Sequence, residues 1–178
     1  MTLKDITSDI GIPTVAAVAD DVVLKDPALL TIGMGGSHTS AWIAVLRALT
    51  EVAQSRLTQI HGAREDTDTA DVRKMIGYER TKRLNRHWFA ESETVRFPEM
   101  PSFDSDDFLT DINHVTERLG RAGLSRVIVV DLTRPEIGIP VVRVIVPGGL
   151  EMYAMDQDRM GGRRCRDARS RRLPRSQL

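Results

Sequence analysis

Three polar side chains of different chemistry recur at helical spacing within a largely apolar stretch of the sequence. Arg47, Glu51 and Gln54 follow one another at intervals of four and three residues. At about 100° per residue, they fall within roughly 60° of one another on a helix. A cation, a carboxylate and an amide that project together from one rigid element can hold a phosphate group and a magnesium ion. The alternative is a solvated helix face whose i, i+4 Arg/Glu pair contributes a few tenths of a kcal/mol.

The helix that would position these side chains is predicted over residues 41–60. A glycine-rich segment, residues 33–36, is expected to form a turn that leads directly into it. Ser37, Thr39 or Ser40 can cap its first turn. We expect the apolar residues of this segment to anchor the opposite face of the helix in a core. These residues are Ala41, Val45, Ala48, Leu49, Val52 and Ala53.

Composition excludes several classes of protein. The 178 residues include 25 basic and 25 acidic side chains, so the formal net charge of zero gives no general reason to expect binding to nucleic acid or to an anionic membrane. The single cysteine, Cys165, rules out an internal disulfide framework and a cysteine-based zinc site. The sequence contains no apolar run of about 18 residues and no signal-peptide layout. We therefore expect a cytoplasmic protein.

The last residues differ sharply from the rest of the chain. Residues 161–178 contain seven arginines, one acidic residue and almost nothing apolar. This composition is typical of a disordered tail and is similar to translation in a shifted reading frame. A nucleic-acid-binding tail is the competing interpretation, although no aromatic side chains accompany the arginines for base stacking. We therefore expect a folded part over residues 1–160 and a disordered tail over residues 161–178.

Two short apolar runs precede the predicted helix. Residues 12–18 lie between a glycine and two aspartates, which predicts a strand, and Pro13 suits the first position of a strand or an edge strand. Residues 29–34 predict a second strand. Because no earlier element is apparent to pair with residues 12–18, we expect an unpaired apolar strand edge there, and self-association through it.

Further helices are predicted in the middle of the chain. Residues 66–71 are acidic and predict a turn, and residues 72–88 predict one sparsely apolar, largely polar helix. Ser105 is predicted to cap another helix that ends near Arg121, with Gly123 as its stop signal.

The two clearest strands lie near the end of the folded part. Residues 126–131 and 140–146 are rich in β-branched residues, and Arg134 and Arg143 flank the strand ends, where a structural role is favoured. Helices that alternate with such strands predict an α/β (α+β) class with a mixed sheet flanked by helices. We expect the helix at residues 41–60 to pack against the sheet that contains these two strands.

Long stretches of the sequence resemble the YcaO family. Residues 36–66 read Gly-Ser-His-Thr-Ser-Ala-Trp-Ile-Ala-Val-Leu-Arg-Ala-Leu-Thr-Glu-Val-Ala-Gln-Ser-Arg-Leu-Thr-Gln-Ile-His-Gly-Ala-Arg-Glu-Asp. This run is similar to the family's Gly-Ser/Thr-His turn, its Arg-Ala-Leu-Thr-Glu-Ala-Ala-Gln-Ser-Arg helix and its Gly-Ala-Arg-Asp/Glu-Asp segment. Residues 4–13 resemble the strand that precedes this helix, and residues 129–148 resemble a strand pair near the end of the family's domain. The resemblance covers about residues 3–160 in the family's order.

The resemblance implies enzymes that bind ATP and Mg²⁺ and phosphorylate a backbone amide oxygen of a peptide substrate. Phosphorylation turns this oxygen, a poor leaving group, into a good one. A neighbouring Cys, Ser or Thr then gives an azoline, external sulfide gives a thioamide and an amine gives an amidine. The strand pair most resembles members that act beside a TfuA-like partner in thioamide formation.

The resemblance also assigns roles to particular residues. It implies Glu51 as a ligand of Mg²⁺ or of the nucleotide, Arg47 as a phosphate contact, and Gln54 one turn further along the same stripe. His38 either touches the ligand or is hydrogen-bonded to the backbone where the helix begins.

Two arginines further along the resembling run allow a structural role. Arg64, with Glu65 and Asp66, forms either an ion-pair loop or part of the site. Arg56 points toward the apolar side of the helix, so we expect a structural pairing with Glu65, Asp66 or Asp131 rather than a substrate contact.

The sequence departs from the family's pattern at both ends. The family's domain is about twice as long, and neither its Ser-x-x-x-Glu-x-x-Glu-Arg helix nor its later Ser and Glu cluster is present here. The Pro-x-Pro-x-Pro ending of azoline-forming members is also missing. A single glutamate is a poor Mg²⁺ site, because Mg²⁺ prefers near-octahedral oxygen coordination. We therefore expect the C-terminal part of a YcaO-type domain that is inactive alone or completed by a separate N-terminal half. The alternative is a non-catalytic module for partner binding or dimerisation.

Overall fold

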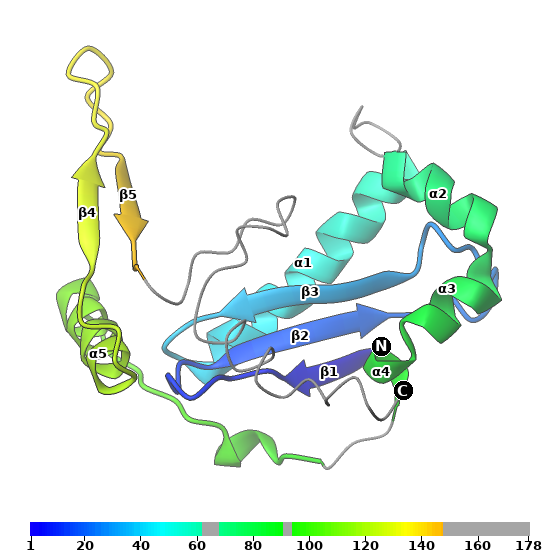
Figure 1. The fold of residues 1–178 in the computed structure, drawn as a ribbon, viewed down its shortest axis with the longest axis horizontal. Coiled ribbons are helices and arrows are strands. Elements are labelled where there is room, and N and C mark those ends of the chain that lie inside the picture. Colours follow the sequence, from blue (N-terminus) through cyan, green and yellow to red (C-terminus); the bar gives the residue numbers. More distant parts are fainter. Residues whose placement is uncertain (62–67, 91–93, 148–178) are drawn as a thin grey trace, which may run out of the picture. The chain divides into compact units, whose positions relative to one another are not determined.

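The structure is a computed structural model that describes residues 1–61, 68–90 and 94–147 (Figure 1). Its elements in chain order are β1 (Thr2–Asp5), β2 (Thr14–Ala19), β3 (Thr31–Ser37), α1 (Ala41–His61), α2 (Asp68–Ile76), α3 (Tyr78–Leu84), α4 (Arg86–Phe89), the 3₁₀ helix η1 (Phe97–Glu99), α5 (Phe108–Arg121), β4 (Ile128–Asp131) and β5 (Val142–Ile145). The chain divides into two compact units, Met1–Val115 and Thr116–Leu178. None of the described helices is long and apolar enough to cross a membrane.

The first unit is built on a three-stranded antiparallel sheet with the order β1-β2-β3. The predicted strand at residues 12–18 is confirmed as β2, which lies in the centre of the sheet. Pro13 directly precedes the first residue of β2, so of its two predicted positions the one at the beginning of the strand fits and the edge strand does not. Thr2 pairs with Val18 on one side, and Thr14 pairs with Ser37 on the other. Strand pairing uses backbone groups, so the polar sequence of β1 gave no signal of it. The free edge that we expected to drive self-association does not exist at β2.

Helix α1 packs on one face of this sheet. The core cluster consists of small residues from β2 and α1, namely Val15, Ala17, Ala19, Ala44, Ala48 and Val52. The glycines at residues 33–36 lie in strand β3, so their prediction as a turn is wrong. A Cβ atom on Gly36 would lie 2.5 Å from the carbonyl oxygen of Ala44 and 2.6 Å from the amide nitrogen of Ala48. The glycine is therefore required by the close approach of α1 to β3.

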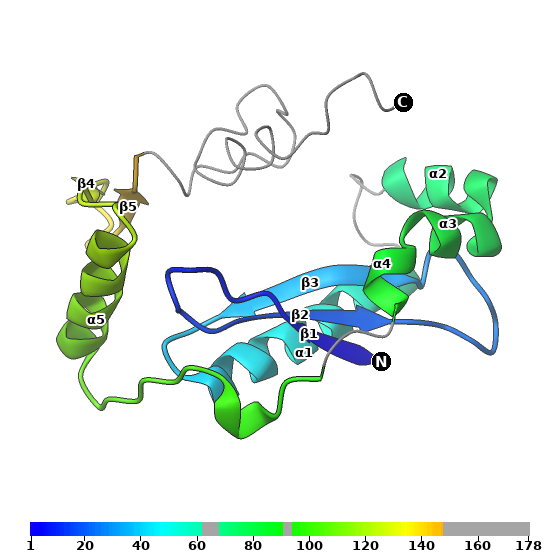
Figure 2. The same ribbon diagram turned by 60° about the horizontal axis from the view of Figure 1, so that its bottom comes forward.

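Helix α4 lies on the opposite face of the sheet, as Figure 2 shows. The Lys4 ammonium on β1 donates hydrogen bonds to the carbonyl oxygens of His87 (2.9 Å) and Ala90 (3.1 Å). The Trp88 ring lies so close to β3 that a Cβ atom on Gly33 would be 3.2 Å from it. Gly33, with φ at 72°, occupies the irregular part of the β2–β3 pairing. Helices thus lie on both faces of the sheet.

The segment after α1 differs from its prediction. Helix α2 begins at Asp68, inside the predicted turn at residues 66–71. Instead of one helix over residues 72–88, the structure has the three helices α2, α3 and α4. Gly77 separates α2 from α3 with φ at 82°, a left-handed conformation that ends a helix at low cost only for glycine. Asn85 separates α3 from α4.

Helix α5 is confirmed, but its predicted cap is not. The carboxylate of Asp107 accepts the backbone N–H of Thr110 at 2.8 Å, so Asp107 caps the helix. Ser105 instead donates from its hydroxyl group to the carboxylate of Asp111 at 2.9 Å. Gly123, with φ at 81°, ends the helix as predicted.

The two late strands are confirmed as β4 and β5, which form an antiparallel hairpin with Ile128 opposite Ile145. The prediction that α1 packs on the sheet containing them is wrong, because α1 packs on β2 and β3. Which strands pair and which sheet a helix packs on depend on tertiary structure, and the local pattern of apolar residues does not determine them. The α+β class with helices flanking the sheet is confirmed. The arginine-rich segment, residues 161–178, lies outside the described residues.

Candidate functional site

Arg47, Glu51 and Gln54 are all exposed and leave α1 on the same side. The buried positions of the helix, Ala41, Ala44, Ala48 and Val52, centre about 100° away from this stripe at helical spacing. The stripe therefore lies on a flank of α1 rather than opposite its buried face, as the sequence had suggested. The exposed position of Ala53 corrects its assignment to that buried face. Figure 1 shows α1 as a long, continuous helix, which holds the three side chains in fixed register.

Arg47 and Glu51 do not pair with each other, although they are four residues apart. Among the described residues, ion pairs form between other side chains, and none joins Arg47 to Glu51. The i, i+4 ion pair of the alternative interpretation is therefore not formed, whereas the exposure of the three side chains fits both a solvated helix face and a ligand site.

The side chains on this flank fit one part of a Mg²⁺ and phosphate site, but not a whole one. Within the residues that the structure describes, no three His, Cys, Asp or Glu side chains come together as a metal site. Glu51 offers a single carboxylate, whereas Mg²⁺ requires several oxygen ligands. Any such site therefore needs further oxygen ligands, from nucleotide phosphates, from water or from residues other than the described ones.

His38 lies at the beginning of α1 and bonds to the backbone, as one of its two predicted roles requires. Its Nδ1 atom accepts the backbone N–H of Ser40 at 3.0 Å. The backbone N–H of Ala41 donates to the hydroxyl group of Ser102 at 3.1 Å, and that hydroxyl donates to Asp104 at 3.0 Å. Hydrogen bonds from the side chains of Ser40 and Ser102 lower the pKa of the Asp104 carboxyl. The start of α1 is thus fixed by a polar network.

Two further arginines were singled out in the sequence, Arg56 and Arg64, and the structure describes only Arg56. Arg56 donates from Nη1 to the carbonyl oxygen of Leu29 at 2.7 Å, which supports the structural role but with a backbone partner. Arg64 lies outside the described residues, and so do Glu65 and Asp66. The role of Arg64 therefore stays a prediction.

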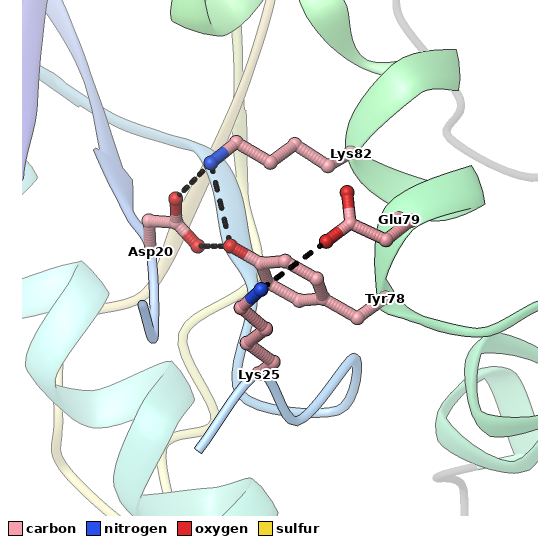
Figure 3. Close-up of polar contacts among 5 residues, drawn as sticks. All are labelled: Asp20, Lys25, Tyr78, Glu79 and Lys82. Atoms are coloured by element: carbon pink, nitrogen blue, oxygen red, sulfur yellow. Dashed lines mark hydrogen bonds and ion pairs between the residues drawn. The ribbon is translucent and has the colours of Figure 1, made fainter. Parts of the chain in front are cut away.

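One polar cluster was missed in the sequence. Figure 3 shows Asp20, which follows β2, facing both Tyr78 and Lys82 of α3. The carboxylate of Asp20 accepts the Tyr78 hydroxyl at 2.8 Å and the Lys82 ammonium at 2.6 Å. Lys82 also lies over the rings of Tyr78 and Phe89, at 5.6 and 5.3 Å from their centroids. The i, i+4 spacing of Tyr78 and Lys82 was the available signal, but it did not reveal the carboxylate across the fold.

The cluster shifts the titration of all three groups. Burial opposes ionisation of Asp20, but the hydrogen bonds from Lys82 and Tyr78 and the charge of Lys82 lower its pKa from the ordinary 3.8. The hydrogen bonds to Asp20 and Tyr78 raise the pKa of Lys82 above 10.5. Burial and the Asp20 carboxylate raise the pKa of Tyr78 above 10.0. Each shift favours the hydrogen-bonded state that clamps α3 to the end of β2.

We expect Lys82→Met to lower the free energy of unfolding by about 1–2 kcal/mol, since a third of the Lys82 side chain is exposed and solvent screens its charge. Lys25→Met, which removes the exposed pair with Glu79 at 3.6 Å, should change stability by at most about 0.5 kcal/mol. Urea unfolding of both variants measures the difference, and equal losses would contradict the clamp.

The loss of stability in Lys82→Met should depend on pH, because the pKa values of Asp20 and Lys82 are shifted in the folded protein. Because the Asp20 pKa is lowered by folding, its stabilisation is present above about pH 4 and lost as the pH falls through the folded-state pKa. Because the Lys82 pKa is raised, its stabilisation is present below pH 10.5 and lost as the pH rises through the folded-state pKa. The difference between the protein and Lys82→Met should therefore be largest between these limits.

The chain matches a family model described as YcaO cyclodehydratase, ATP- and Mg²⁺-binding, over residues 1–150. A protein of Methanothermobacter thermautotrophicus is 56% identical over 164 residues, which make up 92% of this chain and 42% of that protein. A protein encoded in the tfuA 3′ region of Rhizobium leguminosarum bv. trifolii is 33% identical over 153 residues, or 83% of this chain and 36% of that protein. The chain therefore spans less than half the length of these curated relatives.

Solved structures give the same result. The structure of YcaO from Methanopyrus kandleri bound with AMPPCP and Mg²⁺ matches with a TM-score of 0.74 and 33% identity, covering 90% of this chain and 42% of that one. The structure of the heterocyclase TruD matches with a TM-score of 0.66 and 30% identity, covering 85% of this chain and 20% of that one. The α+β fold is thus shared with these known structures. The chain belongs to the YcaO family.

Proposed function

We propose that this chain supplies one part of the ATP and Mg²⁺ site of a YcaO-type enzyme that activates backbone amides of peptides. The observation that carries the proposal is the flank of α1 where Arg47, Glu51 and Gln54 are exposed together without an Arg47–Glu51 pair. The 33% identical structure bound with AMPPCP and Mg²⁺ supports the same ligands.

The chemistry requires a cation and a metal-binding carboxylate at the transferring phosphoryl group. A nucleophile attacks the carbon atom of the amide, and the amide oxygen takes the γ-phosphoryl group of ATP, which leaves ADP. The oxygen then departs as phosphate, and the new bond to the nucleophile remains. Arg47 is suited to contact phosphate oxygens, and Glu51 is suited to hold Mg²⁺ together with carboxylates from elsewhere.

The active protein is a composite in this proposal. One exposed carboxylate does not make a Mg²⁺ site, and the chain spans 42% of its Methanothermobacter relative. Since the 164 matched residues are 42% of that relative, its unmatched part is about 230 residues long. We propose that an equivalent polypeptide completes the site, and that this chain alone is inactive.

A finer assignment is thioamide formation beside a TfuA-like partner. The relative from the tfuA 3′ region supports the TfuA-like partner of this assignment. The second candidate function is a non-catalytic module that binds a partner or dimerises, which the limited set of metal ligands in the described residues favours.

Co-expression tests the proposal. The chain and the unmatched part of the Methanothermobacter relative are purified together and incubated with Mg-ATP, sulfide and a short cysteine-containing peptide. We expect peptide-dependent release of ADP, and a peptide mass in which sulfur replaces oxygen or one water is lost. The chain alone should give neither result. ADP release without any change in peptide mass would contradict amide activation, and an inert pair would favour the non-catalytic module.

A further inference from the structure

The segment that forms the end of α2, α3 and α4 carries a strong local excess of positive charge. Residues 72–88 contain six arginine or lysine side chains and a single acidic one, Glu79, although the net charge of the whole chain is zero. Two of these charged residues are neutralised within the fold. Lys82 pairs with Asp20 at 2.6 Å, and Glu79 pairs with Lys25 at 3.6 Å (Figure 3). The single carboxylate of the segment is therefore already engaged.

Arg80 and Arg83 of α3 have no counter-ion. Both are exposed and lie three residues apart, a spacing at which side chains are neighbours on a helix. Among the described residues, neither guanidinium group has an ion-pair or hydrogen-bond partner. Like charges that are neighbours on a helix destabilise it. An anion bound at both groups would relieve this repulsion in addition to forming new contacts.

The two arginines border one open hollow at the surface of α3. The hollow has a volume of about 420 Å³ and is lined by Lys25, Arg80, Arg83, Glu79 and residues 76–78. Three cations thus surround it, against one carboxylate. Its floor at Gly77 is unobstructed, because a Cβ atom on that glycine would have no neighbour within 4 Å. The hollow has room for several atoms of a ligand and a positive potential to attract an anionic one.

The backbone places Lys25 at the rim of the hollow. Lys25 has φ at 53°, a left-handed conformation that residues with a Cβ atom rarely adopt. Its N–H donates to the carbonyl oxygen of Asp21 at 2.9 Å, and the Asp21 carboxylate accepts the N–H of Leu24 at 3.3 Å. This tight turn carries the Lys25 ammonium to α3, where it engages Glu79. The third cation of the hollow is therefore supplied by the segment after β2.

An acidic stretch of peptide fits this hollow. Guanidinium groups form charge-assisted, paired hydrogen bonds with carboxylates. Carboxylates on alternate residues of an extended peptide are roughly 7 Å apart, close to the roughly 5–6 Å between neighbouring side chains at the spacing of Arg80 and Arg83. Solvent and salt screen a single small anion in so open a site. A peptide binds better there, because it brings several carboxylates together.

Nucleic acid fits the same charges less well, because base stacking needs accessible aromatic rings. Tyr78 lines the hollow but is buried, and its hydroxyl group binds Asp20. The Trp88 ring packs against β3 at Gly33. The aromatic side chains of this part of the described chain thus serve the fold rather than the surface.

We propose that the hollow between Lys25 and α3 binds an acidic segment of the peptide substrate through Arg80 and Arg83. The inference deepens the function proposed above and rests on it for the identification of the peptide as a substrate. It adds a recognition site on α3 to the ATP side assigned to α1.

Fluorescence anisotropy with the full chain tests the site without ATP or turnover. The probe is a fluorescein-labelled peptide of about twelve residues in which glutamate alternates with serine, and the reference peptide has glutamine in place of glutamate. At low ionic strength, we expect the glutamate peptide to bind roughly tenfold more tightly or better. The double variant Arg80→Gln with Arg83→Gln should weaken its binding by at least about tenfold. Both side chains are exposed, so the variant should keep the melting transition of the unmodified chain.

Arg126→Gln with Arg134→Gln is the matched control, because it removes the same charge from two exposed arginines in the other unit. It should change the affinity by less than about twofold. Equal binding of the two peptides, or equal effects of the two double variants, overturns the proposal. An oligothymidylate of the same charge that binds more tightly than the glutamate peptide would reassign the site to nucleic acid. Binding of the glutamate peptide by a protein that never releases ADP would refute the proposed function and keep the anion site. Peptide-dependent ADP release without any preference for the glutamate peptide would refute only the site.

Discussion

Replacing Gly36 with alanine is expected to lower the free energy of unfolding by about 3 kcal/mol or more. The new Cβ atom would lie 2.5 Å from the carbonyl oxygen of Ala44, 2.6 Å from the amide nitrogen of Ala48 and 2.7 Å from the Cβ atom of Arg47. Two of these atoms belong to the backbone of α1, which moves only if the whole helix leaves the sheet. The substitution therefore separates α1 from β3 and displaces the flank that carries Arg47.

Gly35→Ala is the matched control for this prediction. The residue precedes Gly36 on the same strand but is exposed, and a Cβ atom there would meet only the carbonyl oxygen of Val15, at 3.8 Å. Its stability should stay within about 1 kcal/mol of the unmodified protein, because alanine restricts the unfolded chain more than glycine does. Urea unfolding followed by circular dichroism measures both variants. A Gly36→Ala protein as stable as Gly35→Ala would show that α1 does not approach β3 as described.

Glu51→Gln is expected to weaken Mg-ATP binding by the completed protein roughly tenfold to a hundredfold. A charge-assisted contact contributes about 1.5–3 kcal/mol, which corresponds to this range of affinity. Glutamine keeps the size and the helix propensity of the residue, so the effect reports the lost charge. Glu51 is exposed on α1, and the fold of the variant should be unchanged.

Glu79→Gln removes the same charge at another exposed position and serves as the control. Glu79 lies on α3 and is 79% exposed, with Lys25 as its ion-pair partner. Its substitution should leave the affinity for Mg-ATP unchanged. Equal weakening by both variants would indicate a general effect of net charge and would remove Glu51 from the proposed site.

The sequence predicted those elements whose side-chain pattern is strong. Helix α1 combines a glycine-rich approach, capping residues and regular apolar spacing, and its predicted bounds agree with the structure within one residue. Strands β4 and β5 have β-branched runs long enough to identify. The stripe of Arg47, Glu51 and Gln54 was predictable because it depends only on the geometry of one helix.

Features that depend on tertiary packing were not predictable from the same patterns. Strand β1 is short and polar, so its pairing with β2 left no periodic signal. The sequence pattern assigned all apolar residues of α1 to one buried face, although only some of them contact the sheet. Side-chain size, rather than apolar character, decides which residues contact the sheet. Alanine allows the close approach at Gly36, whereas Leu49 and Leu57 are too large for it. The Asp20 clamp joins residues about 60 positions apart.

A calorimetric titration of Mg-ATP into the chain alone and into the co-purified pair tests the composite site most directly. The chain alone should show binding too weak to measure, because the described residues contain no group of three or more metal-binding side chains. The pair should bind Mg-ATP, and the Glu51→Gln pair should bind it at least tenfold more weakly. Low-micromolar binding by the chain alone, or a pair whose affinity is unaffected by Glu51→Gln, would contradict the assignment of the α1 flank as one part of a composite ATP site.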